Sequence, residues 1–372
     1  MMKKALITGT SGQDGSYLAE LLLKKNYEVI GMVRRSSVCN LGRLNNLINH
    51  RNMSLVEGEI SDPLSVYSIV ESVQADEIYN LAAMSHVQTS FAQPSYTFDV
   101  CAKGPLNMLE AIRKYSSHSR FYQASTSELF GKNFTRAPQT AFKYQDENTP
   151  FAPQSPYACA KLAAHDLVRI YRDGYGLHAS AGILFNHGSE RRGEKFVTRK
   201  ITMWMADFYH WKQRLLIDKE RTRNDIDNII STDHNQLPFA KLRLGNLDSF
   251  RDWGHAEDYV YAMWLMMQQD DPDDYVIASG ETHTVREFLT AAFNEINVTD
   301  FEPYIMTDPA FYRPSEVDFL RGIPDKAKNI LGWEPKVSFK DLVRRMVRSD
   351  INGSQKKTPT YSTDRQTAVS TT

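Results

Sequence analysis

The sequence predicts an α/β fold, a doubly wound parallel sheet with helices on both faces and a smaller mixed lobe that binds substrate. Short β-branched or apolar runs alternate with amphipathic stretches through the first half of the chain. The runs are KKALITG, YEVIGMV, MSLVEG, DEIYNLAA, SRFYQAS and HASAGILFN. Segments such as SYLAELLLKK and PLNMLEAIRKY separate them and have helical periodicity. This βαβ order favours a parallel sheet whose ligands bind beyond the carboxyl ends of the strands.

The bulk composition is that of a globular protein without a strong charge bias. Of the 372 residues, 41% are hydrophobic and 24% are charged, and the formal net charge is −1. This balance favours neither nucleic acid nor a membrane surface as a partner. Three scattered cysteines are too few for a disulfide framework or a zinc site, so we expect no metal and a cytoplasmic location. No apolar run is long enough to cross a bilayer.

The chain divides into two parts and a tail. We expect residues 1–186 to form a dinucleotide-binding domain, to which core elements around 254–280 return. Residues 187–351 mainly form the smaller lobe. The last stretch, 352–372, has almost no large apolar side chains and is expected to be disordered.

A glycine motif stands between the first strand and the first helix. The stretch TGTSGQDG places glycines at 9, 12 and 15, which lets backbone N–H groups approach a pyrophosphate at the positive end of a helix. Glycine turns are common for steric reasons, but this position is the context that a Rossmann-type site requires. The predicted cofactor residues here are Gly9, Gly12, Gln13, Asp14 and Gly15.

Two arginines and two serines follow the second strand, as Arg34, Arg35, Ser36 and Ser37. An NAD site usually has an acid here for the ribose 2′-hydroxyl, whereas guanidinium and hydroxyl groups suit a 2′-phosphate. We therefore predict NADP as the cofactor. The alternative is a solvated basic turn.

The later strand ends supply further candidates. Small residues near the end of the fourth strand let a cofactor pass close to the backbone, whereas His86 is interpreted as a packed or hydrogen-bonded side chain. Tyr96 either borders the cofactor or fills core. The remaining predicted cofactor residues are Glu59, Ile60, Leu81, Ala82, Ala83, Ser85 and Tyr96.

A tyrosine and a lysine four residues apart form the second chemical signal. On a helix, Tyr157 and Lys161 share one face, and a cation beside a phenol lowers the pKa of the phenol. This spacing occurs by chance in many helices. Combined with the glycine motif and the strand-end hydroxyl of Thr126, it predicts a catalytic site for oxidation of an alcohol.

The sequence resembles the extended short-chain dehydrogenase/reductase family and, within its nucleotide-sugar enzymes, the GDP-mannose 4,6-dehydratases. The resembling stretches include TGTSGQDGSYLAELLLKK, VRRSS, ASTSELFG, SPYACAK, GILFNHGSERRGEKFVTRKIT, LGNLDSFRDWGHAEDYV and FYRPSEVDFL. The resemblance implies GDP-mannose as substrate, NADP as cofactor, a homodimer or homotetramer, and a product on the way to deoxysugars of the GDP-fucose or GDP-rhamnose type. It places Thr126, Glu128, Tyr157 and Lys161 on catalytic positions. It places Tyr157, Lys161, His187 and Arg192 at the cofactor. The substrate residues that it implies are Ser85, Asn186, Arg192, Lys200, Arg251, Arg313 and Glu316.

The carboxylate of Glu128 distinguishes dehydration from simpler chemistry. Once C4 of a sugar is oxidised, one carboxyl group can accept the C5 proton and deliver a proton to the departing C6 hydroxyl. A plain acidic residue beside a turn is the alternative. Two other functions stay open: dehydration or 4-epimerisation of another nucleotide sugar, and NADP sensing without catalysis. Segments 133–147 and 218–240 are longer than the family usually has, and we expect the first to lie in the lid over the sugar.

Overall fold

The computed structural model describes residues 2–37, 40–137, 142–217 and 239–354. Its centre is a seven-stranded sheet in the order β13-β8-β5-β4-β1-β2-β3, and all six strand pairs are parallel. The strands are β1 (Lys4–Thr8), β2 (Glu28–Val33), β3 (Met53–Glu57), β4 (Glu77–Asn80), β5 (Arg120–Ala124), β8 (Ala179–Leu184) and β13 (Tyr275–Ile277). The predicted doubly wound parallel sheet is confirmed.

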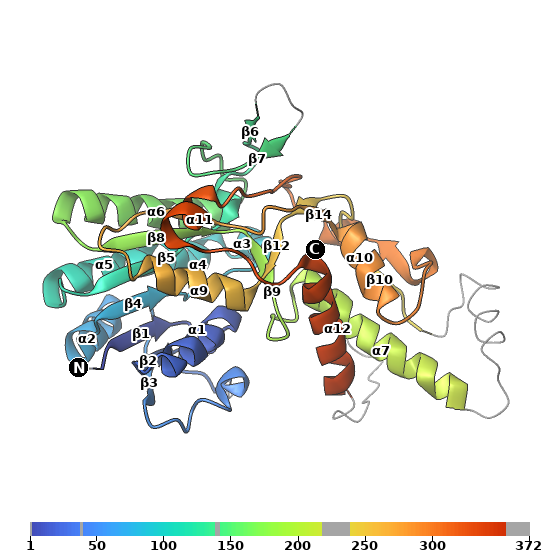
Figure 1. Cartoon of the computed structure of the whole chain (residues 1–372), viewed down its shortest axis with the longest axis horizontal. Coiled ribbons are helices and arrows are strands. Elements are labelled where there is room, and N and C mark those ends of the chain that lie inside the picture. The colour runs from blue at the N-terminus through green and yellow to red at the C-terminus, as the bar shows by residue number, and fades with distance from the viewer. Residues whose placement is uncertain (1, 38–39, 138–141, 218–238, 355–372) are drawn as a thin grey trace, which may run out of the picture.

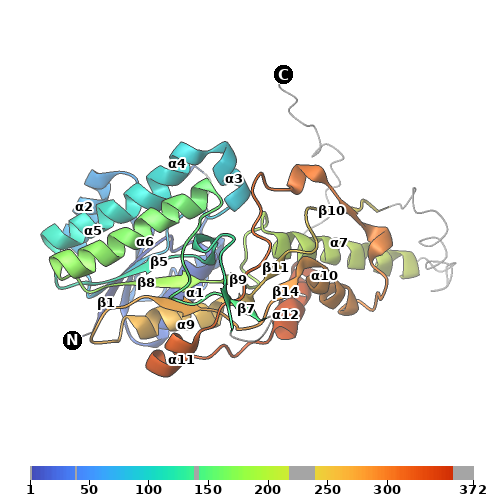
Figure 2. The same ribbon diagram turned by 90° about the horizontal axis from the view of Figure 1, so that it is seen from above.

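Helices cover both faces of this sheet (Figure 2). One face carries α1 (Gln13–Lys24), α9 (Ala256–Met266) and α11 (Asp325–Leu331), which pack into one apolar cluster with Trp333. The other face carries α2 (Pro63–Val73), α3 (Val87–Ala92), α4 (Pro94–Phe98), α5 (Gly104–Tyr115) and α6 (Pro156–Tyr175). The strand order reverses between β1 and β4, so the crevice for a ligand opens at their carboxyl ends.

The smaller lobe packs around aromatic side chains of a long helix. Its helices are α7 (Val197–Ile217), α10 (Val285–Asn294) and α12 (Phe339–Ser354), and β10 (Leu242–Leu244) pairs in parallel with β15 (Ile305–Thr307). Phe208 of α7 is fully buried and lies 4.8 Å, between ring centroids, from Tyr304. The aromatic residues of α7 therefore hold the lobe together.

Short strand pairs connect the lobe to the sheet domain (Figure 1). β9 (Asn186–Gly188) pairs in parallel with β12 (Trp253–His255), and β11 (Phe250–Arg251) pairs antiparallel with β14 (His283–Thr284). A hairpin of β6 (Thr135–Arg136) and β7 (Lys143–Tyr144) projects from the rim. A π-helical stretch, η2 (Asp99–Lys103), joins α4 directly to α5. Short 3-10 turns complete the fold: η1 (Gly42–Leu44), η3 (Ser127–Leu129), η4 (Glu302–Tyr304) and η5 (Pro309–Phe311).

Some predicted features fall on residues that the structure does not describe. The tail lies there from residue 355 onward, and so does nearly all of the long polar segment 218–240. Within the described ranges, no helix combines the length and the apolar character that crossing a membrane requires.

Candidate active site

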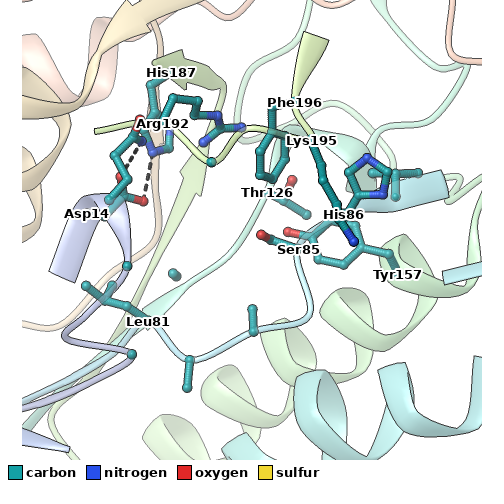
Figure 3. A pocket seen from close by; sticks show the side chains of 18 of the residues that line it. Asp14, Leu81, Ser85, His86, Thr126, Tyr157, His187, Arg192, Lys195 and Phe196 are labelled. Carbon is teal, nitrogen blue, oxygen red and sulfur yellow. Dashed lines mark hydrogen bonds and ion pairs between the residues drawn. The ribbon is translucent and has the colours of Figure 1, made fainter. Parts of the chain in front are cut away.

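A cavity of about 1150 Å³ opens at the carboxyl ends of the strands and extends onto the smaller lobe. All the predicted site residues line it except Ser37, which is exposed to solvent beyond the end of β2. Figure 3 shows Ser85, Thr126 and Tyr157 pointing toward one another on one side of the cavity, with Asp14 and His187 on the other side. The sheet therefore brings together residues that are far apart in the sequence.

The glycine motif forms a cradle that side chains would fill. Gly9 has a φ of +68°, and a Cβ there would lie 2.9 Å from the backbone nitrogen of Ala82. A Cβ on Gly15 would lie 2.4 Å from the carbonyl oxygen of Gly9. Glycine is the residue that satisfies both constraints without strain. Since α1 begins at Gln13, the cradle meets a positive helix end, which fits a dinucleotide pyrophosphate.

An ion pair joins the glycine motif to the smaller lobe. The Nε2 atom of His187 lies 2.9 Å from Oδ2 of Asp14, and its Nδ1 atom lies 2.8 Å from the Phe185 carbonyl oxygen. Burial opposes the charge of Asp14, but its interaction and hydrogen bond with His187 outweigh burial and lower the pKa of Asp14 to about 2. The two side chains thus fix each other's position at this wall of the cavity.

The predicted basic turn after β2 lies at the rim of the cavity. Arg34 donates a hydrogen bond of 2.7 Å from its guanidinium to the Tyr96 hydroxyl, and Arg35 and Ser36 also line the cavity. Tyr96 is 39% exposed and so does not fill core. On the neighbouring wall, Glu59 accepts a hydrogen bond from the Ser61 hydroxyl.

The tyrosine and the hydroxyls lie at the centre of the cavity. Tyr157 and Lys161 are on one face of α6, and the Thr126 side chain hydrogen-bonds to Tyr157. The ammonium of Lys161 donates a 2.8 Å hydrogen bond to the Ala124 carbonyl oxygen and lies 6.0 Å from the centroid of the Tyr157 ring. Both side chains are almost fully buried. These contacts place a phenol, a hydroxyl and an ammonium around one point.

In this arrangement, burial outweighs the lowering of the phenol's pKa that Lys161 was expected to cause. Burial raises the pKa of Tyr157 well above its ordinary value, and the Thr126 hydrogen bond lowers it only in part. Burial also lowers the pKa of Lys161. The ammonium of Lys161 donates its hydrogen bond to the carbonyl oxygen of Ala124. The Tyr-x-x-x-Lys spacing does not predict this tertiary contact.

Glu128 lies in a cluster of two carboxylates and two guanidinium groups. Its Oε1 atom lies 3.4 Å from Arg313, which in turn lies 3.6 Å from Glu316. Arg251 pairs with Glu316 at 2.9 Å, and burial lowers the pKa of Arg251. The backbone nitrogen of Glu128 donates to the Thr126 hydroxyl at 3.3 Å. This cluster joins the end of β5 to the smaller lobe and presents two cations to the cavity.

Three more predicted residues line the lobe side of the cavity. Arg192 lies with its guanidinium 3.8 Å from the Phe196 ring, and burial lowers its pKa. Lys200 lies 3.6 Å from the centroid of Phe311. The side-chain oxygen of Asn186 is buried and, among the described residues, has no hydrogen-bond partner. These groups provide positive charge, aromatic surface and a free acceptor.

Several residues that line the cavity were not predicted from the sequence. Arg43 donates from Nε to the Arg191 carbonyl oxygen at 2.8 Å and from another nitrogen to the Ser11 carbonyl oxygen at 3.3 Å. It thereby ties the glycine motif to the loop that carries Arg192. In the sequence, Arg43 is indicated only by its place as a single arginine in a turn rich in glycine and asparagine.

His86, interpreted as packed or hydrogen-bonded, accepts a hydrogen bond from the Thr89 backbone nitrogen and packs edge-on against Phe196. Other missed lining residues are Ser125, Lys195, Phe196, Ser249 and Phe311.

The described part of the long segment 133–147 lies away from the cavity. None of its described residues lines the cavity, and Gln145 instead forms a bridge with Gly322. Residues 133–137 and 142–147 therefore do not form the expected lid; they contain the two paired strands β6 and β7.

Comparison with known proteins identifies the family. The chain matches the family model described as GDP-mannose 4,6 dehydratase over residues 6–226 and 218–346. It is 46% identical to GDP-mannose 4,6 dehydratase 1 of Arabidopsis thaliana over 359 residues, which cover 94% of this chain and 90% of the relative.

Solved structures share the fold at low sequence identity. A dTDP-glucose 4,6-dehydratase of Streptomyces venezuelae, solved with NAD and TYD bound, has a TM-score of 0.75 at 22% identity, with 95% of this chain and 98% of that one covered. RMD of Pseudomonas aeruginosa, solved with NADPH, has a TM-score of 0.69 at 20% identity, with coverages of 95% and 100%. Sequence and structure agree, and the chain belongs to the GDP-mannose 4,6-dehydratase family.

Proposed function

We propose that this enzyme, a hydro-lyase, dehydrates GDP-mannose to GDP-4-keto-6-deoxymannose with Tyr157, Thr126, Lys161 and Glu128 as its catalytic residues. The observation that carries the proposal is the position of Glu128. It lies beside the hydroxyl that hydrogen-bonds Tyr157, 3.4 Å from Arg313, and it interacts electrostatically with Arg251. Both guanidinium groups suit an anionic diphosphate. A simple alcohol dehydrogenase has no need of this carboxylate. Turnover of purified protein with GDP-mannose, followed by mass spectrometry for loss of water, tests the activity.

The chain's residues divide the proton transfers between them. Tyr157 accepts the proton of the C4 hydroxyl, and Thr126 hydrogen-bonds the same oxygen. Because burial raises the pKa of Tyr157, proton removal needs additional positive charge close to the phenol. Lys161 is the cation on the same helix face, and it orients the ribose of the cofactor. The nicotinamide, when bound, supplies a reversible acceptor for hydride.

Glu128 completes the dehydration. The ketone at C4 makes the C5 proton acidic, and Glu128 accepts that proton. The same carboxyl group then protonates the C6 hydroxyl, which leaves as water. Glu128 is 6% exposed, so water competes little with the sugar for its proton.

The substrate's nucleotide is held by the smaller lobe. We place the diphosphate against Arg251 and Arg313, and the rest of the nucleotide sugar against Ser85, Asn186, Arg192 and Lys200. Glu316 pairs with Arg251 and orients it. Guanidinium groups grip phosphate oxygens bidentately, which supports this placement.

The enzyme uses a nicotinamide dinucleotide, and we propose NADP in particular. The glycine cradle and the helix end support the pyrophosphate, with Gln13, Asp14, Leu81, Ala82, Ala83 and His187 on the wall around it. Arg34, Arg35 and Ser36 support the 2′-phosphate, and Glu59 and Ile60 border the adenine. Ser37 is left out of this proposal, since it does not line the cavity.

Arg35→Asp is expected to weaken NADP binding by about a hundredfold and NAD binding by much less, because it removes a charge-assisted contact and adds repulsion. Isothermal titration with both cofactors measures the difference. Arg51→Asp, at an exposed arginine outside the cavity, is the matched control. Equal losses for NADP and NAD remove Arg35 from the site.

We also propose a homo-oligomer, a dimer or a tetramer. Exposed apolar side chains on α4 and α6 support it: Phe98 is 42% exposed, Ile170 46% and Tyr175 55%. Burying such surface against a second copy is favourable. Light scattering of the purified protein gives the mass of the assembly.

A further inference from the structure

A buried carboxylate outside the cavity joins three segments of the chain. Asp252 follows Arg251 and is fully buried. Its Oδ1 atom accepts hydrogen bonds from the backbone nitrogen and the hydroxyl of Ser279, both at 2.7 Å. Its Oδ2 atom accepts from the backbone nitrogens of Gly280 at 3.0 Å and Gly322 at 3.2 Å. All four partners are donors, so only a group with acceptors on both atoms fits.

The three segments meet at the junction between the sheet and the lobe. Ser279 and Gly280 follow β13, the outer strand of the sheet. Gly322 ends the segment that carries Arg313 and Glu316. Further bonds reinforce the junction, since Arg321 donates to the Gly280 carbonyl oxygen at 2.9 Å. Asp252 therefore fixes the substrate-side segment relative to the sheet.

The adjacent side chains of Arg251 and Asp252 point to opposite sides of the extended backbone. Arg251 lines the cavity and pairs with Glu316, whereas Asp252 does not line the cavity. Alternation along an extended backbone explains the difference. A shift of Asp252 would thus move Arg251 directly and Arg313 through the segment that ends at Gly322.

In the described part of the chain, no cation pairs with the carboxylate of Asp252. Among the ion pairs of the described residues, none includes Asp252, and burial raises its pKa to about 7 in spite of the four hydrogen bonds. A buried charge without a paired cation is costly. The four hydrogen bonds offset part of this cost and fix the direction of both carboxylate oxygens.

We propose that Asp252 is a positioning residue for the nucleotide sugar, which holds Arg251 and the segment 313–322 in the geometry that binds the diphosphate. This inference rests on the proposed function, since it presumes that the two arginines bind the substrate. Asp252 itself touches neither substrate nor cofactor.

Asp252→Asn is the sharpest test, because asparagine keeps the shape but directs an NH2 group at backbone N–H groups. The dissociation constant of GDP, measured by titration calorimetry, and the KM for GDP-mannose are each expected to rise about tenfold, the effect of losing well-formed hydrogen bonds. We expect the NADP dissociation constant to stay the same, because the proposed cofactor wall does not contact Asp252.

Asp258→Asn is the matched control. Asp258 is also buried and accepts from the backbone nitrogens of Lys336 at 2.9 Å and Val337 at 3.0 Å, but it lies outside the cavity. We expect it to lower the melting temperature without changing GDP affinity. Equal changes of GDP affinity in both variants, or unchanged affinity in Asp252→Asn, overturn the proposal.

A milder variant covers the case in which Asp252→Asn does not fold. Ser279→Ala removes one of the four donors and leaves the backbone intact, so the GDP dissociation constant is expected to rise about twofold to threefold. No rise in that variant overturns the proposal. Failure of the wild-type protein to bind GDP or to turn over GDP-mannose is a separate result, which contradicts the proposed function instead.

Discussion

Tyr157→Phe is expected to lower kcat with GDP-mannose by about 10³-fold, the usual size of a lost general acid–base group. The variant lacks only the phenol oxygen that accepts the proton of the C4 hydroxyl and hydrogen-bonds Thr126, while the ring keeps its packing. Steady-state turnover and single-turnover absorbance of reduced nicotinamide measure the effect. No reduced cofactor is expected, because the block precedes hydride transfer.

Tyr122→Phe is the control for this variant. The Tyr122 hydroxyl is also fully buried, and no described group hydrogen-bonds to it. Its removal is expected to leave kcat within about twofold of wild type, since no proton transfer depends on it. A Tyr157→Phe enzyme with the activity of Tyr122→Phe would remove the phenol from the mechanism.

Glu128→Gln is expected to reduce product formation by about 10² to 10³-fold while the first oxidation still proceeds. Glutamine keeps the size of the side chain but can neither accept the C5 proton nor donate to the C6 hydroxyl. Reduced nicotinamide should therefore accumulate up to one equivalent per site in a single turnover. Rapid-quench mass spectrometry should find the sugar without loss of water.

Glu147→Gln provides a comparison at a carboxylate outside the cavity. Glu147 is partly buried and accepts from the backbone nitrogen of Val276 at 2.7 Å. This variant is expected to keep full turnover. If Glu128→Gln also keeps wild-type turnover, Glu128 is a plain acidic residue beside a turn.

The glycine motif and the strand ends were predictable because each depends on local sequence. Gly9 and Gly15 stand at a βα junction, and the structure shows that neither position has room for a Cβ. The parallel sheet was predictable because short apolar runs alternate with amphipathic segments along the chain. The spacing of apolar residues and the length of each segment distinguish strands from helices. The end of β5 placed Thr126 and Glu128 beside Tyr157 in the same way.

Contacts between distant segments could not be predicted. Lys161 bonds the Ala124 carbonyl and Arg43 bonds the carbonyls of Ser11 and Arg191, and no motif encodes such partners. The sequence showed that segment 133–147 is long, but it did not show where the paired strands β6 and β7 would lie. Burial decides the pKa of Tyr157, and burial is a property of the packed fold.

The central claim is that oxidation at C4, loss of water across C5 and C6, and reduction at C6 occur in one site. It is tested most directly by GDP-mannose deuterated at C4. Tyr157, Thr126 and Glu128 line one cavity, so the unsaturated sugar does not have to leave between the steps. Mass spectrometry and NMR of the product should find the deuterium at C6, a solvent proton at C5 and no accumulated NADPH. Deuterium retained at C4, or lost to free NADPH, would contradict the dehydratase mechanism.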